Sequence, residues 1–178
     1  MSRRFSLWPA FLAGLLVLGA CAGPTAPTDD IGDLARDRDA AAAAGEVDLD
    51  FTVATLDGGT FDGKSLAGKP AVLWFWAPWC PTCAAEAPHV AQAATTYQGK
   101  IVIVGVAGLD ELSAMHRFVE LTKVDNIPHL ADQQGVVWKR FGVTAQSTYV
   151  LLDATGAVVY RGYLSNNELD RRLTGLAG

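Results

Sequence analysis

A chain of 178 residues, half of them apolar, is long enough to bury one domain-sized core. Its formal net charge of −5 and its lack of any basic run argue against nucleic acid as a partner. Three cysteines are an odd number, so at least one of them needs a function of its own.

The N-terminal residues resemble an export signal of the lipoprotein type. Arg3 and Arg4 precede an apolar stretch, from about residue 7 to residue 20, that is too short to span a bilayer well. The stretch closes on the letters LGAC at 18–21, which resemble a lipobox, where signal cleavage leaves a lipid-modified cysteine. We therefore expect residues 1–21 to be a lipoprotein signal peptide and Cys21 to be the site of lipid attachment. The alternative is a signal peptide that merely contains a cysteine near its end.

Export is expected to use general secretion. Arg3 and Arg4 suggest a twin-arginine signal, but Ser6 stands where that pattern has a bulky apolar residue. The protein is thus expected outside the cytoplasm, held by its lipid to the outer face of the cytoplasmic membrane. No glutathione pool keeps thiols reduced there, so a dithiol either makes disulfides or needs a dedicated supply of electrons.

Residues 22–46 consist mainly of Ala, Asp, Gly, Pro and Thr, with almost no large apolar side chain. Such a segment cannot bury enough surface to fold, so we expect a disordered tether there. Large apolar side chains become frequent from Val47 onward, and residues 47–178 are expected to form a single folded domain.

Beyond the tether, strand and helix patterns alternate. In chain order they predict strands at 51–56 and 60–61, a buried strand at 71–76, a helix at 84–97 with Pro88 inside it, and a second buried strand at 101–106. An amphipathic helix is predicted at 111–123, with Met115, Phe118, Val119 and Leu121 on one side, and a short helix at 136–141. A hairpin of 149–152 and 158–160 follows, and a capping box of Ser165 and Glu168 opens the last helix. Strand–helix–strand units followed by a hairpin imply an α/β protein with a mixed central sheet and helices on both faces. This order permits a thioredoxin-like fold without requiring one.

Two cysteines stand where a buried strand gives way to a helix. Cys80 lies at the start of the helical segment, where unpaired backbone N–H groups and the helix dipole stabilise a thiolate. Cys83 lies about one turn further on the same face, within disulfide reach, and Pro81 suits the first turn of a helix. We therefore expect Cys80 to be the exposed nucleophile that forms a mixed disulfide and Cys83 the more buried thiol that resolves it.

Three other uses of the cysteine pair compete with catalysis. A zinc site needs further ligands, but Cys21 belongs to the signal and His89, His116 and His129 stand singly, so no metal is expected. An inert structural disulfide that closes so short a loop would add little stability. A peroxidatic cysteine would follow a Thr or Ser by three residues, whereas Ala77 occupies that position.

Three segments carry a family resemblance: GKPAVLWFWAPWCPTC at 68–83, VGVAGLD at 104–110 and FGVTAQ at 141–146. They look like the TlpA/DsbE-type extracytoplasmic thioredoxins, and most closely the DsbF-like lipoproteins, over about residues 51–173. The resemblance implies a thioredoxin fold and a thiol–disulfide oxidoreductase that exchanges its Cys80–Cys83 disulfide with exported cysteine-containing polypeptides. It also implies no cofactor beyond the dithiol, and the DsbE/DsbF branch is associated with oxidation. A membrane redox partner, which the sequence does not identify, would recycle the dithiol.

The sequence departs from thioredoxin itself beneath the active site. Trp74 stands where thioredoxin has an Asp, and the segment 104–107 offers no basic residue in place of its partner. A proton acceptor for Cys83 must therefore come from elsewhere. Glu86 is the candidate, because it lies one helical turn after Cys83 and is followed by Pro88, as in the TlpA-like pattern Cys-x-x-Glu-x-Pro. The alternative is a glutamate on the solvent-facing side of the helix.

A second departure lies in the loop that faces the dithiol. The family places a cis-proline after the residue that corresponds to Gln146, and this chain has Ser147 there, followed by Thr148. The serine restores a backbone N–H and adds a hydroxyl, either of which could donate to the Cys80 thiolate. A neutral replacement is the alternative. By resemblance, the substrate is expected to bind Trp79, Pro81, Gln146, Ser147 and Thr148.

The sequence thus predicts a lipid-anchored thiol–disulfide oxidoreductase that donates its disulfide to exported polypeptides. A thiol reductase, for example in cytochrome c maturation, is the alternative within the same chemistry. A different alternative is a non-catalytic polypeptide-binding module that uses Trp79 and the Ser147 loop without turnover. The reduction potential separates oxidase from reductase, because it measures how much better the folded protein stabilises the thiolate than the disulfide.

Overall fold

The computed structural model describes residues 47–178. The expected signal peptide, the lipid site at Cys21 and the tether lie outside the described residues and stay predictions. Among residues 47–178, no helix combines the length and the apolar character needed to cross a bilayer.

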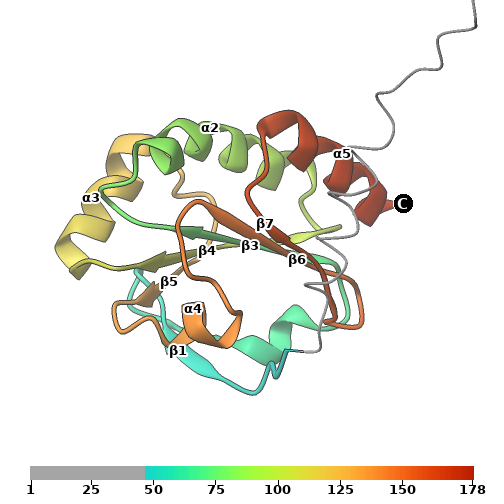
Figure 1. Ribbon diagram of the computed structural model, residues 1–178, viewed down its shortest axis with the longest axis horizontal. Helices are drawn as coiled ribbons and strands as arrows, with labels where there is room; N and C mark the ends of the chain where they lie inside the picture. The colour runs from blue at the N-terminus through green and yellow to red at the C-terminus, as the bar shows by residue number, and fades with distance from the viewer. Residues whose placement is uncertain (1–46) are drawn as a thin grey trace, which may run out of the picture.

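A mixed sheet of five strands forms the centre of the molecule, in the order β5-β4-β3-β6-β7 (Figure 1). The strands are β3 (Ala71–Trp76), β4 (Val102–Gly108), β5 (His129–Asp132), β6 (Thr148–Leu152) and β7 (Val158–Gly162). β3, β4 and β5 run parallel to one another, whereas β6 and β7 are each antiparallel to the strand before them in the sheet. The expected mixed sheet is confirmed, and its central strand β3 leads directly into the cysteine pair.

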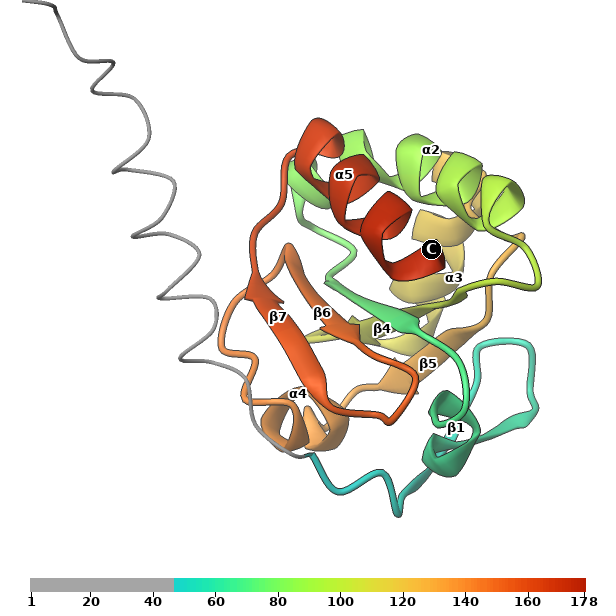
Figure 2. The ribbon, with the colours of Figure 1, turned by 90° about the vertical axis from the view of Figure 1, so that its right-hand side faces the viewer.

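Helices cover both faces of this sheet (Figures 1 and 2). One face carries α2 (Pro81–Thr96), α3 (Leu112–Thr122) and α5 (Asn166–Ala177). The other face carries α4 (Val136–Arg140), the 3₁₀ helix η1 (Gly63–Leu66) and the small hairpin of β1 (Thr52–Ala54) and β2 (Thr60–Asp62). This arrangement is the thioredoxin-like fold that the element order permitted.

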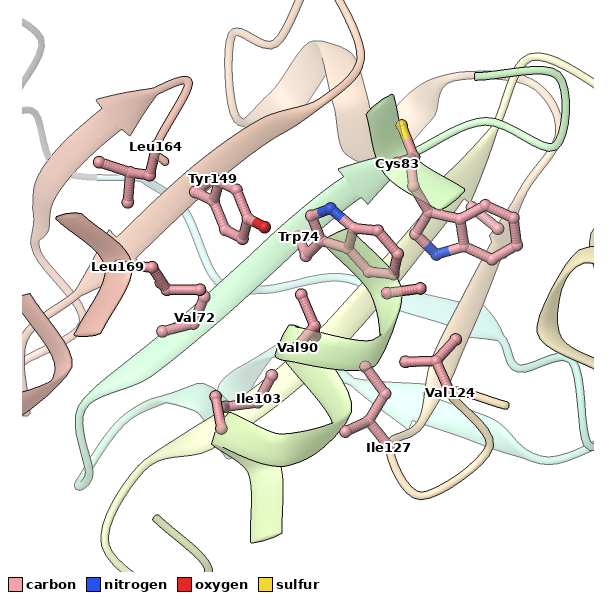
Figure 3. Close-up of a cluster of buried hydrophobic side chains, with 14 of the residues drawn as sticks. Val72, Trp74, Cys83, Val90, Ile103, Val124, Ile127, Tyr149, Leu164 and Leu169 are labelled. Atoms are coloured by element: carbon pink, nitrogen blue, oxygen red, sulfur yellow. The ribbon is translucent and has the colours of Figure 1, made fainter. Parts of the chain in front are cut away.

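The central strand β3 is buried along its whole length because each face meets a different core. Val72, Trp74 and Trp76 belong to the core under α2, α3 and α5, while the alternate residues of β3 belong to the core under α4. Figure 3 shows part of the first core, with Trp74 close to Tyr149 and beneath the start of α2. The continuous apolar run at 71–76 follows from this double burial.

The start of α2 differs from the expected helix at 84–97. The helix begins three residues earlier, at Pro81, and Cys80 is its N-cap. Ala-rich composition located the body of the helix but missed its first turn, which depends on Pro81 at the first helical position and on the cap. Pro88 lies inside the helix, as expected.

Other expectations were wrong in smaller ways. The strand β5 was not expected, because His129–Asp132 is short and begins and ends with polar residues; its pairing with β4 is supplied by the tertiary fold. Leu121 was expected on the buried side of α3 but is 74% exposed, whereas Met115 and Phe118 are buried. The capping box of Ser165 and Glu168 at the start of α5 is confirmed.

Candidate active site

The two cysteines of the Cys-x-x-Cys segment form a disulfide at the carboxyl end of β3. A short turn connects Trp76 to Cys80, whose backbone is extended, and the helix α2 begins at the next residue. The Cα atoms of Cys80 and Cys83 are 5.3 Å apart, which lies within the usual range for a disulfide. The sequence spacing therefore brings the pair together as expected.

The start of α2 provides the electrostatic environment of Cys80. The backbone N–H of Cys83 donates a hydrogen bond to the sulfur of Cys80, at 3.0 Å, so this sulfur caps the helix. No acidic residue lies in the first turn of α2. The free N–H groups and the positive end of the helix dipole therefore favour a thiolate at Cys80.

Cys80 is more buried than the sequence suggested, whereas Cys83 is buried as expected. Cys80 was expected to be exposed, but only 5% of it is accessible, against 0% of Cys83. The order of accessibility is the expected one, although the difference is small. Tight packing of the turn before α2 against the first core explains the low exposure of Cys80, which belongs to that core.

Glu86 lies on α2 one turn after Cys83 and is buried, with 5% of its surface accessible. The indole Nε1–H of Trp74 donates to Glu86 Oε2 at 3.0 Å, and the hydroxyl of Ser147 donates to the same oxygen. The other carboxylate oxygen, Oε1, is buried and has no hydrogen-bond partner among the described residues. A glutamate on the solvent-facing side of the helix is therefore excluded, whereas a role in proton transfer stays a prediction.

Trp74 is buried at the position where thioredoxin has an Asp, and it contacts Glu86. The tryptophan fills the space beneath α2, and its indole N–H holds the carboxylate that α2 supplies. Tyr149 of β6 lies opposite Trp74 in the sheet and points its hydroxyl toward it (Figure 3). Burial, and then the neighbouring Glu86 carboxylate, raise the pKa of Tyr149 far above its ordinary value, so this hydroxyl keeps its proton.

The expected substrate-binding residues do not share one environment. Trp79 is 54% exposed, its indole N–H reaches the carbonyl of Leu109 at 3.4 Å, and Pro81 is exposed beside the disulfide. Gln146 and Thr148 are half-buried. Ser147 is 5% exposed, and its hydroxyl donates to Glu86 rather than to Cys80. Donation to the Cys80 thiolate by the backbone N–H of Ser147 stays a prediction.

A groove of about 510 Å³ opens beside Trp79, between the start of α2 and α3. Its walls are Pro78, Trp79, Ala84, Phe118 and Leu121, with Asp110 and Arg117 among its polar residues. The groove offers an apolar surface next to the disulfide that the sequence did not reveal. It forms because α2 and α3 pack side by side on one face of the sheet.

His129 and His89 are engaged in structural contacts. His129 is buried, with Nε2 donating to the carbonyl of Val124 at 2.8 Å and Nδ1 accepting from the indole of Trp76 at 3.2 Å. Burial lowers the pKa of His129, so its ring is neutral. His89 pairs with Asp170 at 2.9 Å. Within residues 47–178, no group of three or more His, Cys, Asp or Glu side chains could hold a metal ion.

The two departures from the family pattern, Trp74 and Ser147, are linked in the structure, which their positions in the sequence did not reveal. Both side chains donate to Glu86. The sequence did contain a signal, because a side chain that can donate a hydrogen bond stands at each of these two positions, one before and one after Glu86 in the chain. Their meeting depends on the pairing of β3 with β6, which places Ser147 just beyond the paired end of the two strands.

Comparisons with known proteins agree with this site. Residues 42–174 match the Redoxin family. The chain is 41% identical to the soluble secreted antigen MPT53 of Mycobacterium tuberculosis over 76% of this chain and 79% of that protein. A solved structure of M. tuberculosis dsbF is 52% identical, covers 72% of this chain and 96% of its own, and superposes with a TM-score of 0.68. A secreted M. tuberculosis disulfide oxidoreductase homologous to E. coli DsbE is 41% identical, covers 72% and 97% of the two chains, and has a TM-score of 0.67.

These matches confirm the resemblance drawn from the three sequence segments, and they cover the strand, the cysteine pair and the loop that faces it. With the disulfide at the N-terminus of α2, they favour thiol–disulfide exchange as the use of the cysteine pair. The chain belongs to the redoxin family and is a thiol–disulfide oxidoreductase.

Proposed function

We propose that the protein works as an oxidase, donating its Cys80–Cys83 disulfide to exported polypeptides. The observation that supports this direction is the capping contact between the Cys83 N–H and the Cys80 sulfur, in a first helical turn without acidic residues. This environment stabilises the Cys80 thiolate, which exists only in the reduced protein. A protein that stabilises its reduced form gives up its disulfide readily.

Donation requires two exchanges. A substrate thiolate attacks the sulfur of Cys80, the bond between Cys80 and Cys83 breaks, and Cys83 leaves as a thiolate that takes up a proton. A second substrate thiolate then attacks the substrate sulfur of the mixed disulfide, which closes the substrate disulfide and releases the Cys80 thiolate. Two electrons have then moved from the substrate to the protein. A redox partner in the membrane, which accepts these electrons, would restore the disulfide.

Glu86 is proposed to carry the proton of Cys83. It is buried on the same helix, one turn from Cys83, and its Oε1 is free of hydrogen bonds among the described residues. The carboxyl group gives the proton when Cys83 leaves and takes it back when Cys83 attacks the mixed disulfide.

The substrate polypeptide is proposed to lie across Trp79, Pro81 and the loop of Gln146 and Thr148. Trp79 offers an exposed aromatic surface, and the adjacent groove can receive apolar side chains that an unfolded polypeptide presents. Exchange at the sulfur needs no cofactor beyond the dithiol. Contacts of this kind suit many sequences, as a donor of disulfides to exported chains requires.

Lipid attachment at Cys21 completes the proposal and would hold the domain at the outer face of the cytoplasmic membrane. Its support is the lipobox-like segment at 18–21. A signal-derived cysteine with two or more acyl chains anchors firmly, because each buried methylene contributes about 0.8 kcal/mol.

The reduction potential tests the direction of exchange. We expect equilibration with glutathione buffers to give a value clearly above the roughly −270 mV of thioredoxin. The protein should also speed the oxidation of a reduced, unfolded secreted protein, and the Cys80→Ser variant should not. A potential at or below that of thioredoxin, together with brisk reduction of insulin, would instead identify a reductase.

A further inference from the structure

The hydroxyl of Ser147 joins the loop that faces the disulfide to the buried acid of α2. It donates to Glu86 Oε2, and both residues are only 5% exposed. The indole of Trp74 donates to the same oxygen at 3.0 Å. Three parts of the chain therefore converge on one carboxylate oxygen: the strand β3, the helix α2 and the segment just before β6.

The two oxygens of Glu86 are unequal as a result. Oε2 accepts two hydrogen bonds, whereas Oε1 is buried and accepts none from the described residues. A buried carboxylate oxygen without a donor is energetically unfavourable. Two donors on Oε2 fix the plane of the carboxyl group and leave Oε1 as the atom that is ready to take a proton.

We propose that Ser147 is a positioning residue for the proton transfer at Cys83, acting through Glu86. Its hydroxyl orients the carboxyl group, so that Oε1 can accept the proton of Cys83 when this thiol resolves a mixed disulfide. The inference rests on the proposed proton-carrying role of Glu86. A proline at position 147 would have no hydroxyl and could not make this contact, so the serine adds a function to the loop rather than replacing proline neutrally.

The neighbours of Glu86 are consistent with this role. The titratable side chain of Tyr149, on β6, interacts with Glu86. Its raised pKa keeps its hydroxyl protonated at neutral pH. Cys83 lies on the same helix as Glu86, one turn earlier. Trp74 and Ser147 are uncharged donors, which leaves Cys83 as the thiol proposed to exchange a proton with Glu86.

The test separates the two thiol steps with DTNB, an aromatic disulfide that releases a coloured thiolate. In the reduced protein, the Cys80 thiolate attacks DTNB and releases the first coloured thiolate. Cys83 then attacks the Cys80 sulfur, gives up its proton and releases the second. Stopped-flow absorbance therefore reports attack by Cys80 as the first phase and resolution by Cys83 as the second, each as a function of pH.

We expect Ser147→Ala to slow the second phase about tenfold near neutral pH and to move its pH midpoint upward by about one unit, with the first phase changed little. Ser147→Thr, which keeps a hydroxyl, should restore the wild-type profile. The control is Ser65→Ala, which removes an exposed hydroxyl that donates to the carbonyl of Asp62, and it should match the wild type. If Ser147→Ala does not fold, Ser147→Pro serves as the variant without a hydroxyl.

Glu86→Gln separates this inference from the proposed role of Glu86. If Glu86→Gln shifts the second phase and adding Ser147→Ala to it produces no further change, the two residues act as a unit, as we propose. If Glu86→Gln shifts the profile but Ser147→Ala leaves it at the wild-type position, the inference about Ser147 is wrong while the role of Glu86 stands. An unchanged profile in Glu86→Gln overturns both. A folded Ser147→Thr variant that behaves like Ser147→Ala would also overturn the inference.

Discussion

The backbone of Cys83 supports the sulfur of Cys80: its N–H donates to Cys80 Sγ at 3.0 Å. The contact makes the two cysteines chemically unequal although they share one disulfide. Cys80 is the N-cap of α2, where the positive end of the helix dipole lies, whereas Cys83 lies inside the helix and is fully buried. This inequality leads to the first prediction.

Cys80→Ser should abolish disulfide exchange, because the nucleophile at the helix N-terminus is lost. Cys83→Ser should still attack and then stall as a mixed disulfide, since no second thiol resolves it. Trapping of cysteine-containing polypeptides by each variant, read on non-reducing gels with mass spectrometry, measures the difference. Equal trapping by both variants would contradict the assignment of roles.

Gly105→Ala should destabilise the fold by about 2–3 kcal/mol, because overpacking a well-filled core typically costs this much. An added Cβ would lie 2.1 Å from Nδ1 of His129 and 2.9 Å from Nε1 of Trp76. The His129 ring cannot move aside without losing its bond to the carbonyl of Val124. Urea denaturation followed by tryptophan fluorescence measures the change.

The matched control is Gly175→Ala in α5, where an added Cβ meets no atom within 4 Å. This substitution should stabilise the protein by up to about 1 kcal/mol, because alanine favours a helix over glycine. A stability loss in Gly105→Ala no larger than the change in Gly175→Ala would show that the space around His129 is not tightly filled.

His129 should make stability depend on pH. Burial lowers its pKa in the folded protein below the ordinary value of 6.5, so the unfolded chain binds more protons at acidic pH. The contribution of His129 is therefore fully present above about pH 6.5 and is lost as the pH falls below it, with a slope of at most about 1.4 kcal/mol per pH unit.

Free energies of unfolding measured from about pH 5 to about pH 8 test this dependence, because histidine titrates in this range. His129→Gln should flatten the curve, although it will lower stability overall. His116→Gln, at an exposed histidine of α3, should keep the wild-type slope. A slope that survives in His129→Gln would assign the pH dependence to other groups.

Cys21→Ala should release the protein from the membrane fraction into the soluble fraction, while the exchange activity measured in vitro stays unchanged. The reason is that the expected lipid is attached at this residue, far in sequence from the disulfide. Fractionation and mass spectrometry of the mature protein provide the measurement. Wild-type protein that is soluble and carries no lipid would refute the lipobox.

The amino-acid sequence by itself determined the features that depend on neighbouring residues. The spacing of Cys80 and Cys83 at a helix start predicts a disulfide, because one helical turn sets their separation. The apolar run of β3 predicts a strand buried on both faces, and Ser165 with Glu168 predicts the start of α5, since a capping box needs only four consecutive residues.

Only the tertiary structure decided how distant residues meet. Ser147 and Glu86 are 61 positions apart, and Trp76 and His129 are 53 positions apart. Whether such side chains touch depends on which strands are neighbours and in which register, and the composition of either segment does not contain that information. The sequence could therefore identify Glu86 as a candidate acid and Ser147 as a departure from the family pattern. The pairing of β3 with β6 beneath α2 decided that the serine hydroxyl contacts Glu86 instead of the Cys80 sulfur.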